Sequence, residues 1–342
     1  MSNGGTATAG LGPAGDDEGP AGAAEVGAVE IGAGPAGPAA RLGGRSRWAD
    51  IGGRVHYLDF GGPAGAPVIV CVHGLEGAAV NWVALAPRLT DRCRVLAPDL
   101  AGHGLTRAAG RSTSVRANQA LLHGFIQTVA GGPVILMGNS MGGMISLLEA
   151  SAVPDLVTAL VLVDPALPFV PARPDPVVVG LFGASALPGV KSLVTGYRRR
   201  WAPEVLVSRL LWLCCADSSR VSEPVVAAHV ETARLRSSFA DADRDLSAAV
   251  RSILLSASYV TGHRYRQAVR AVNCPVLLLH GAADRLVPVA AARAAARSCP
   301  AWTLAVLPGI GHVPQLEAPD DCAQIIGGWL GAKVPFGREG RR

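Results

Sequence analysis

Gly138-Asn139-Ser140-Met141-Gly142 is the stretch that decides the fold of this chain. A short apolar run, Pro133-Val134-Ile135-Leu136-Met137, precedes it and predicts a buried strand. The residues that follow, 143–150, predict the start of a helix. A serine between a strand and a helix occupies a strained turn, and flanking glycines remove side chains that would clash there. The stretch therefore has both the pattern and the context of a G-x-S-x-G nucleophile elbow.

Around this motif, the composition permits a large buried core. Of the 342 residues, 49% are hydrophobic and 17% are charged, which suits a large α/β domain. The net charge of +5 is scattered, with small clusters at Arg198-Arg199-Arg200 and Arg341-Arg342. Because no basic face is formed, we expect no nucleic-acid partner. Peripheral contact with a membrane is left open, and so is the oligomeric state.

The cysteines and the first residues predict the compartment. Seven cysteines without regular spacing argue against a disulfide framework and favour packing residues in a reducing environment. Met1-Ser2-Asn3-Gly4-Gly5 lacks the basic and apolar regions of a secretory signal, and no apolar run is long enough to span a bilayer. No His/Cys/Asp cluster has metal-ligand spacing. We therefore expect a soluble, cytoplasmic protein without a metal site or a cofactor.

The chain divides into a tail, a core and an insertion. Residues 1–44 are rich in glycine, alanine and proline and predict a disordered tail. Short apolar runs alternate with helical spacing over residues 45–164 and again over residues 271–332, as in a parallel α/β sheet. Residues 165–270 lack such runs and predict a helical cap or lid. Residues 333–342 form a short C-terminal tail.

Individual elements follow from the same patterns. The expected strands besides the one before Ser140 are Arg54–Asp59, Val68–Val72, Val95–Ala97, Leu160–Val163, Val276–Leu279 and Thr303–Val306. The expected helices of the core include Trp82–Leu89, Val115–Val129 and Pro319–Leu330. Most of these strands are continuously apolar, which is typical of strands covered on both faces.

A serine hydroxyl becomes an effective nucleophile when an imidazole takes its proton and a carboxylate orients that imidazole. In folds with a nucleophile elbow the three groups follow the order serine, acid, histidine. Asp284 and His312 each follow one of the apolar runs after the insertion. Because parallel strands end at one edge of a sheet, we predict a triad of Ser140, Asp284 and His312. Asp164, which also follows a strand, stays open as a rival acid.

A negatively charged intermediate needs two backbone N–H donors, the oxyanion hole. We expect one from Met141 at the start of the helix and one from Leu75 in the loop 73–77. Gly74 allows that loop to approach a substrate closely, and Glu76 and Asn139 are further candidates for substrate contact. The histidines of the neighbouring motifs are expected to be structural: His73, His103 and His280.

In their order, these motifs resemble the α/β-hydrolase fold superfamily over roughly residues 48–332. The shared markers are His73-Gly74, Asp99-Leu100-Ala101-Gly102-His103-Gly104, the serine elbow, Gly281-x-x-Asp284 and Gly311-His312. The resemblance implies an α/β fold with a mostly parallel eight-stranded sheet flanked by helices. It also implies a helical cap inserted between strands six and seven.

The nucleophile narrows the reaction that the resemblance implies. Ser140 stands where epoxide hydrolases and haloalkane dehalogenases of this superfamily carry an aspartate, so these two activities are disfavoured. A serine with an oxyanion hole favours acyl transfer to water through an acyl-enzyme. The first expectation is a serine hydrolase of the carboxylesterase or lipase type, acting on esters of hydrophobic small molecules or lipids.

Two alternatives stay open. The elbow also resembles that of carbon–carbon bond hydrolases of the meta-cleavage-product type. Those relatives usually have a glycine-richer oxyanion loop and a tryptophan where this chain has Val313. Some members of the superfamily keep a triad yet serve as ligand receptors. Within the cap, the apolar stretches Val177–Val194 and Val205–Cys215 predict a preference for hydrophobic acyl groups.

Overall fold

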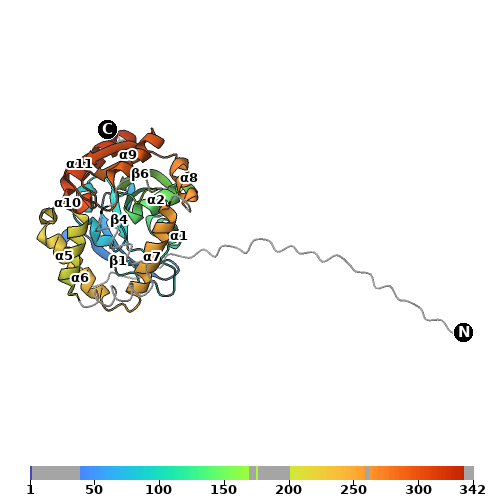
Figure 1. The fold of residues 1–342 in the computed structure, drawn as a ribbon, viewed down its shortest axis with the longest axis horizontal. Helices are drawn as coiled ribbons and strands as arrows, with labels where there is room; N and C mark the ends of the chain where they lie inside the picture. The colour runs from blue at the N-terminus through green and yellow to red at the C-terminus, as the bar shows by residue number, and fades with distance from the viewer. Residues whose placement is uncertain (2–38, 169–174, 176–200, 259–261, 335–342) are drawn as a thin grey trace.

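At the centre of the computed structural model, which describes residues 1, 39–168, 175, 201–258 and 262–334, is an eight-stranded sheet (Figure 1). The strands are β1 (Arg45–Asp50), β2 (Arg54–Gly61), β3 (Val68–Val72), β4 (Arg94–Pro98), β5 (Val134–Asn139), β6 (Val157–Val163), β7 (Val276–Gly281) and β8 (Thr303–Leu307). Their order is β1-β2-β4-β3-β5-β6-β7-β8. β2 pairs antiparallel with β1 and β4, and the other neighbours pair in parallel. The predicted α/β fold with a mostly parallel sheet is confirmed.

Helices cover both faces of this sheet. They are α1 (Val115–Phe125), α2 (Met141–Ala152), α5 (Pro203–Cys214), α6 (Glu223–Arg236), α7 (Ala242–Ala257), α8 (His263–Ala271), α9 (Val289–Ser298), α10 (Pro314–Glu317) and α11 (Pro319–Lys333). Shorter 3₁₀ turns are η1 (Ala40–Leu42), η2 (Ala79–Trp82), η3 (Ala86–Leu89), η5 (Pro154–Leu156) and η6 (Ser218–Arg220), and a π-helical turn, η4 (Ile126–Ala130), extends α1.

The strands are apolar at successive positions because each one is covered from both sides. Every residue of β5 and of β7 is buried. Ile135 and Met137 pack into one core with residues of α5 and α11, whereas Val134 and Leu136 pack into the other with residues of α1 and α2. Successive side chains of a strand point to opposite faces of the sheet, so each strand contributes to two separate hydrophobic cores.

The described helices α5 to α8 all belong to the insertion, the segment of the chain between β6 and β7. They form two groups on different parts of the molecule. α5 and α6 pack together, and α6 contacts η2, whereas α7 contacts α1 and α8 contacts α2. Figure 1 shows the first pair in yellow and the second in orange, on different sides of the strands. Among the described residues, no helix is both long and apolar enough to cross a bilayer.

Some boundaries differ from the sequence prediction. The fold includes residues before 45, because η1 forms at Ala40–Leu42 and Ala39 is fully buried. β1 was not predicted, since it is an edge strand whose residues are exposed or half-exposed except Ala49, with no clear apolar alternation. In place of the predicted helix at 82–89, the structure has the 3₁₀ turn η2, which ends at Trp82, and the 3₁₀ turn η3 at Ala86–Leu89. The remaining tail predictions, the stretch 177–194 and the arginines at 198–200 lie outside the described residues.

Candidate active site

Ser140 lies on the turn between β5 and α2 and has a strained backbone. Its φ of 54° and ψ of −117° fall outside the regions that non-glycine residues ordinarily occupy. The neighbouring backbones leave no room for larger residues around it. A Cβ atom at Gly138 would lie 2.5 Å from Gly142 O, and one at Gly142 would lie 2.1 Å from Val72 O. Glycine is thus required at both positions, because any side chain there would collide with neighbouring backbone atoms.

The predicted oxyanion loop lies directly against this turn. A Cβ atom at Gly74 would be 3.0 Å from Ser140 Cβ. His73 fixes the loop, because its Nδ1 donates to Gly74 O at 2.8 Å and its Nε2 accepts from the Leu100 N–H at 3.0 Å. Burial lowers the pKa of His73. A neutral imidazole with its hydrogen on Nδ1 satisfies both bonds, so the structural role expected for His73 follows from its contacts.

The two predicted oxyanion donors flank the elbow. Met141 is the first residue of α2, where backbone N–H groups have no partner within the helix. Leu75 follows Gly74 in the adjacent loop and is half-buried. In the part of the chain that the structure describes, neither N–H donates to a backbone or side-chain acceptor. Both are therefore available to an oxygen bound beside Ser140, and their role stays a prediction.

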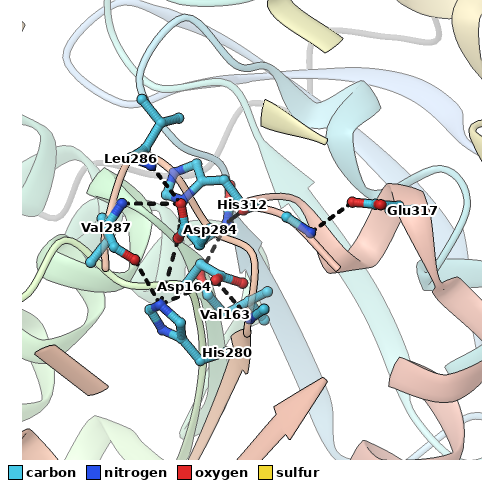
Figure 2. A network of polar contacts seen from close by, with 11 residues as sticks. Val163, Asp164, His280, Asp284, Leu286, Val287, His312 and Glu317 are labelled. Atoms are coloured by element: carbon cyan, nitrogen blue, oxygen red, sulfur yellow. Dashed lines mark hydrogen bonds and ion pairs between the residues drawn. The ribbon is translucent and has the colours of Figure 1, made fainter. Parts of the chain in front are cut away.

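His312 and Asp284 meet at the same edge of the sheet. His312 Nδ1 lies 2.7 Å from Asp284 Oδ2, and Figure 2 shows the two side chains facing each other. Asp284 Oδ1 accepts the backbone N–H groups of Leu286 at 2.8 Å and Val287 at 3.0 Å. Both predicted residues are buried. Among the described residues Ser140 Oγ has no hydrogen-bond partner, so its link to His312 stays a prediction.

Asp284 has an environment suited to a carboxylate. Burial acts to raise its pKa, but the charge and the hydrogen bond of His312 outweigh it, and the pKa falls below the ordinary value. The neighbouring His280 and a hydrogen bond from Asp164 act in the same direction. Asp284 is therefore held as a carboxylate beside the His312 imidazole, and its role as the acid of a triad stays a prediction.

Asp164, the rival acid, has the opposite environment. It is fully buried at the end of β6, with a positive φ of 43°. Its Oδ1 accepts the Gly281 N–H at 2.9 Å, but no N–H of the described residues reaches Oδ2. Burial, followed by the nearby Asp284 charge, raises the pKa of Asp164 well above its ordinary value. A proton on Asp164 makes it a donor to Asp284, and the two acids then share one negative charge.

Asp164, His280 and Asp284 form a buried group that has the residue types of a metal site. His280 Nε2 lies 3.4 Å from Asp164 Oδ1 and 3.6 Å from Asp284 Oδ2. The same nitrogen lies 2.9 Å from the Val287 carbonyl oxygen, which accepts only if Nε2 carries a hydrogen. A protonated nitrogen has no lone pair for a cation, so this arrangement suits an acid pair better than a metal.

Replacing Asp164 by asparagine is expected to flatten the pH dependence of stability. With a raised pKa, folded Asp164 keeps a proton that the unfolded chain releases above its ordinary pKa of 3.8. The folded wild type thus binds more protons, and its free energy of unfolding falls as pH rises from there towards the folded pKa. Asparagine has no such proton. The variant should gain stability relative to wild type as pH rises above about 4, as measured by urea unfolding. Parallel pH dependences of the two proteins would contradict this.

Asn139, predicted to contact substrate, also has a structural role. It is buried, and its Nδ2 donates to Val163 O and to His312 O, each at 3.0 Å. Both amide hydrogens are thereby used within the protein. Asn139 thus ties the end of β5 to the loop that carries His312, and its predicted contact with substrate stays a prediction. The predicted substrate contacts of Gly74 and of the half-buried Glu76 stay predictions.

One buried residue beside His312 was missed by sequence reasoning. Glu317, at the end of α10, accepts the Gly311 N–H at 2.8 Å and also reaches the insertion. Its only signal in the sequence is an acid among apolar residues, Leu316 and Ala318-Pro319, five positions after His312. That pattern alone does not distinguish a buried carboxylate from an exposed one.

Comparisons with known proteins agree with this fold and its elbow. Residues 69–325 match the alpha/beta hydrolase family. A pimeloyl-[acyl-carrier protein] methyl ester esterase of Aromatoleum aromaticum is 31% identical over 265 residues, 76% of this chain and 96% of the relative. A 2-hydroxy-6-oxo-2,4-heptadienoate hydrolase of Pseudomonas putida is 28% identical over 278 residues, 79% of this chain and 91% of the relative.

A solved structure of a putative lipase from Acinetobacter baumannii superposes with a TM-score of 0.68 at 24% identity, covering 85% of this chain and 92% of the other. At that identity the likeness shows the fold alone. The family match spans the elbow, both candidate acids and His312, and the esterase relative is matched over nearly its whole length. The chain therefore belongs to the alpha/beta hydrolase family.

Proposed function

We propose that this hydrolase cleaves carboxylic esters of hydrophobic small molecules or lipids through an acyl-enzyme on Ser140. The observation that carries the proposal is the 2.7 Å contact of His312 Nδ1 with Asp284, at the sheet edge where the strained turn presents Ser140. Two relatives, named as a methyl ester esterase and as the lipase LipV of Mycobacterium tuberculosis, support ester substrates. Because the LipV match covers only 40% of that protein, the support for ester substrates comes mainly from the esterase.

The chemistry follows from the position of each group. His312 Nε2 takes the proton of Ser140 as Oγ attacks the carbonyl carbon of the ester. The N–H groups of Leu75 and Met141 stabilise the resulting oxyanion. When the intermediate collapses, the alcohol leaves with the proton from His312 and the acyl group stays on Oγ. Water then repeats the sequence with His312 as base, releasing the acid and restoring Ser140. Asp284 holds the imidazole in the tautomer that this requires.

The direct test is hydrolysis of p-nitrophenyl esters together with labelling by a fluorophosphonate, a reagent that modifies activated serines. Wild-type protein is expected to turn over the esters and to label at one site, identified as Ser140 by peptide mass analysis. Labelling without ester turnover would favour carbon–carbon hydrolysis, for which the Pseudomonas putida relative is the precedent. Neither labelling nor turnover, combined with a stability shift on ligand addition, would favour a receptor.

Longer acyl chains are expected to be better substrates. A cavity of about 410 Å³ lies beside the acid loop. Trp212 of the apolar helix α5, Cys215, Ala216 and Ala283 form its apolar wall, and Asp217, Ser218 and Arg285 form its polar wall. We propose that the acyl chain lies along the apolar wall. Burial of added methylene groups then contributes to binding of the transition state. We expect kcat/KM for the octanoyl ester to exceed that for the acetyl ester by roughly 10-fold or more. Equal values for the two esters would contradict a hydrophobic acyl site.

A further inference from the structure

The carboxylate of Glu317 joins the loop that carries His312 to the insertion. Its side chain is fully buried. Oε2 accepts the N–H of Gly311 at 2.8 Å and that of Ala216 at 3.1 Å, and Oε1 accepts the N–H of Asp217 at 2.9 Å. Gly311 precedes His312, whereas Ala216 and Asp217 follow α5 in the insertion. One buried charge thus accepts backbone donors from two segments that are far apart in sequence.

A second contact holds the backbone of His312 itself. The His312 N–H donates to Cys214 O, the last residue of α5, at 2.6 Å. The two backbones are so close that a Cβ atom at Gly311 would lie 2.3 Å from Cys214 O and 2.6 Å from Ala216 N. We call Cys214–Asp217 the insertion turn. It contacts the His312 loop through hydrogen bonds and through direct backbone packing.

Two further polar groups of His312 are held by the core. Its carbonyl oxygen accepts from Asn139 Nδ2 at 3.0 Å, and its Nδ1 contacts Asp284. The backbone of His312 is therefore fixed at its oxygen by the elbow strand and at its nitrogen by the insertion turn. If the insertion turn moves, it pulls on the backbone nitrogen of His312 while the carbonyl oxygen stays fixed. The imidazole then shifts relative to Ser140.

We propose that Glu317 is a positioning residue that clamps the insertion turn onto the His312 loop, so that the insertion sets the place of the general base. This inference rests on the proposed serine mechanism. A carboxylate accepts all three N–H groups, whereas an amide in its place directs its own NH2 group at one of them. Buried donors left without an acceptor are costly, and the turn and the loop then separate.

The test compares Glu317→Gln with wild type. The variant is expected to lower kcat by roughly 10- to 100-fold, because displacement of a catalytic group by about 1 Å has effects of that size. Because Cys215, Ala216 and Asp217 of the insertion turn also line the cavity beside the acid loop, KM for a short ester is measured as well. A positioning role predicts that kcat falls by a larger factor than KM changes. The rate of fluorophosphonate labelling should fall with kcat, and the low-field NMR signal of the His312–Asp284 hydrogen bond should shift. All rates are taken per titrated active site, which separates the effect from loss of folded protein.

A matched control is Glu149→Gln. Glu149 is another buried carboxylate, which interacts with Gln119 and His123 of α1 and, among the described residues, has no hydrogen bond or ion pair with the His312 loop. Its replacement should lower the melting temperature without changing kcat or the NMR signal. If Glu317→Gln behaves like this control, with lower stability and unchanged kcat, Glu317 is merely structural and the inference is overturned.

A second variant, Gly311→Ala, keeps the Glu317 charge but forces the insertion turn away from the loop. It should reproduce the loss of kcat, and it carries the test if Glu317→Gln fails to fold. Gly327→Ala on α11, where a Cβ atom meets nothing within 4 Å, is its control. If wild type neither labels nor turns over esters, the proposed function fails. The NMR comparison still reports then whether Glu317 positions His312, and an unchanged signal would overturn the inference separately.

Discussion

Replacement of Ser140 by alanine is expected to lower kcat for ester hydrolysis by about 10⁶-fold and to abolish fluorophosphonate labelling. The proposed mechanism forms its only covalent bond at Ser140 Oγ, and no other group can take over that step. The variant should keep the fold, because alanine is smaller than serine and tolerates the turn no worse. Residual hydrolysis would come from the oxyanion donors and the unaltered imidazole.

The measurement is a p-nitrophenyl ester assay with active-site titration, alongside circular dichroism to verify folding. Ser298→Ala, on the exposed end of α9, is the control and should match wild type. Turnover by Ser140→Ala near the wild-type rate would contradict the serine mechanism, whatever the substrate. A folded variant that binds esters without hydrolysing them would agree with it.

Replacement of Asp284 by asparagine is expected to lower kcat by about 10⁴-fold, because the amide stabilises the wrong imidazole tautomer. The neighbouring Asp164 provides a matched comparison in the same buried pair. Protonated Asp164 donates to Asp284 and accepts from the Gly281 N–H, and an asparagine there can do both. Asp164→Asn should therefore keep kcat within a few-fold of wild type.

Steady-state kinetics of the two variants decide between the acids. A large loss in Asp284→Asn with a small one in Asp164→Asn supports the assignment of Asp284. The reverse result would make Asp164 the catalytic acid and the contact of His312 with Asp284 incidental. Equally large losses of kcat in both variants would mean that Asp164 and Asp284 act as one unit and share a single negative charge.

Local pattern was sufficient to predict the elbow and the candidate acid and base. Ser140, Asp284 and His312 each follow an apolar strand, and parallel strands bring their ends to one edge of the sheet. Continuous apolar runs likewise predicted the strands that are covered on both faces. The pattern is missing from β1, because Arg45–Asp50 lie at the edge of the sheet and all but Ala49 are exposed or half-exposed.

The supports of His312 could not be predicted in this way. Glu317 accepts from Ala216, about a hundred positions earlier in the chain, and Asn139 reaches His312 over an even longer separation. Such contacts depend on the path of the insertion, and no spacing in the sequence encodes that path. Asp164 was recognised as an alternative acid, but its protonation depends on burial and on the nearby Asp284 charge.

The insertion turn has a consequence for recombination among related hydrolases. An exchange of the whole segment between β6 and β7 would transplant substrate preference, but it would also remove Cys214–Asp217 from beneath the His312 loop. A chimera that keeps these four residues should inherit a working proton relay with its new specificity. A chimera that discards them should bind the donor's substrates and turn them over slowly. The exchange should therefore leave Cys214–Asp217 in place and should not replace everything between the ends of β6 and β7.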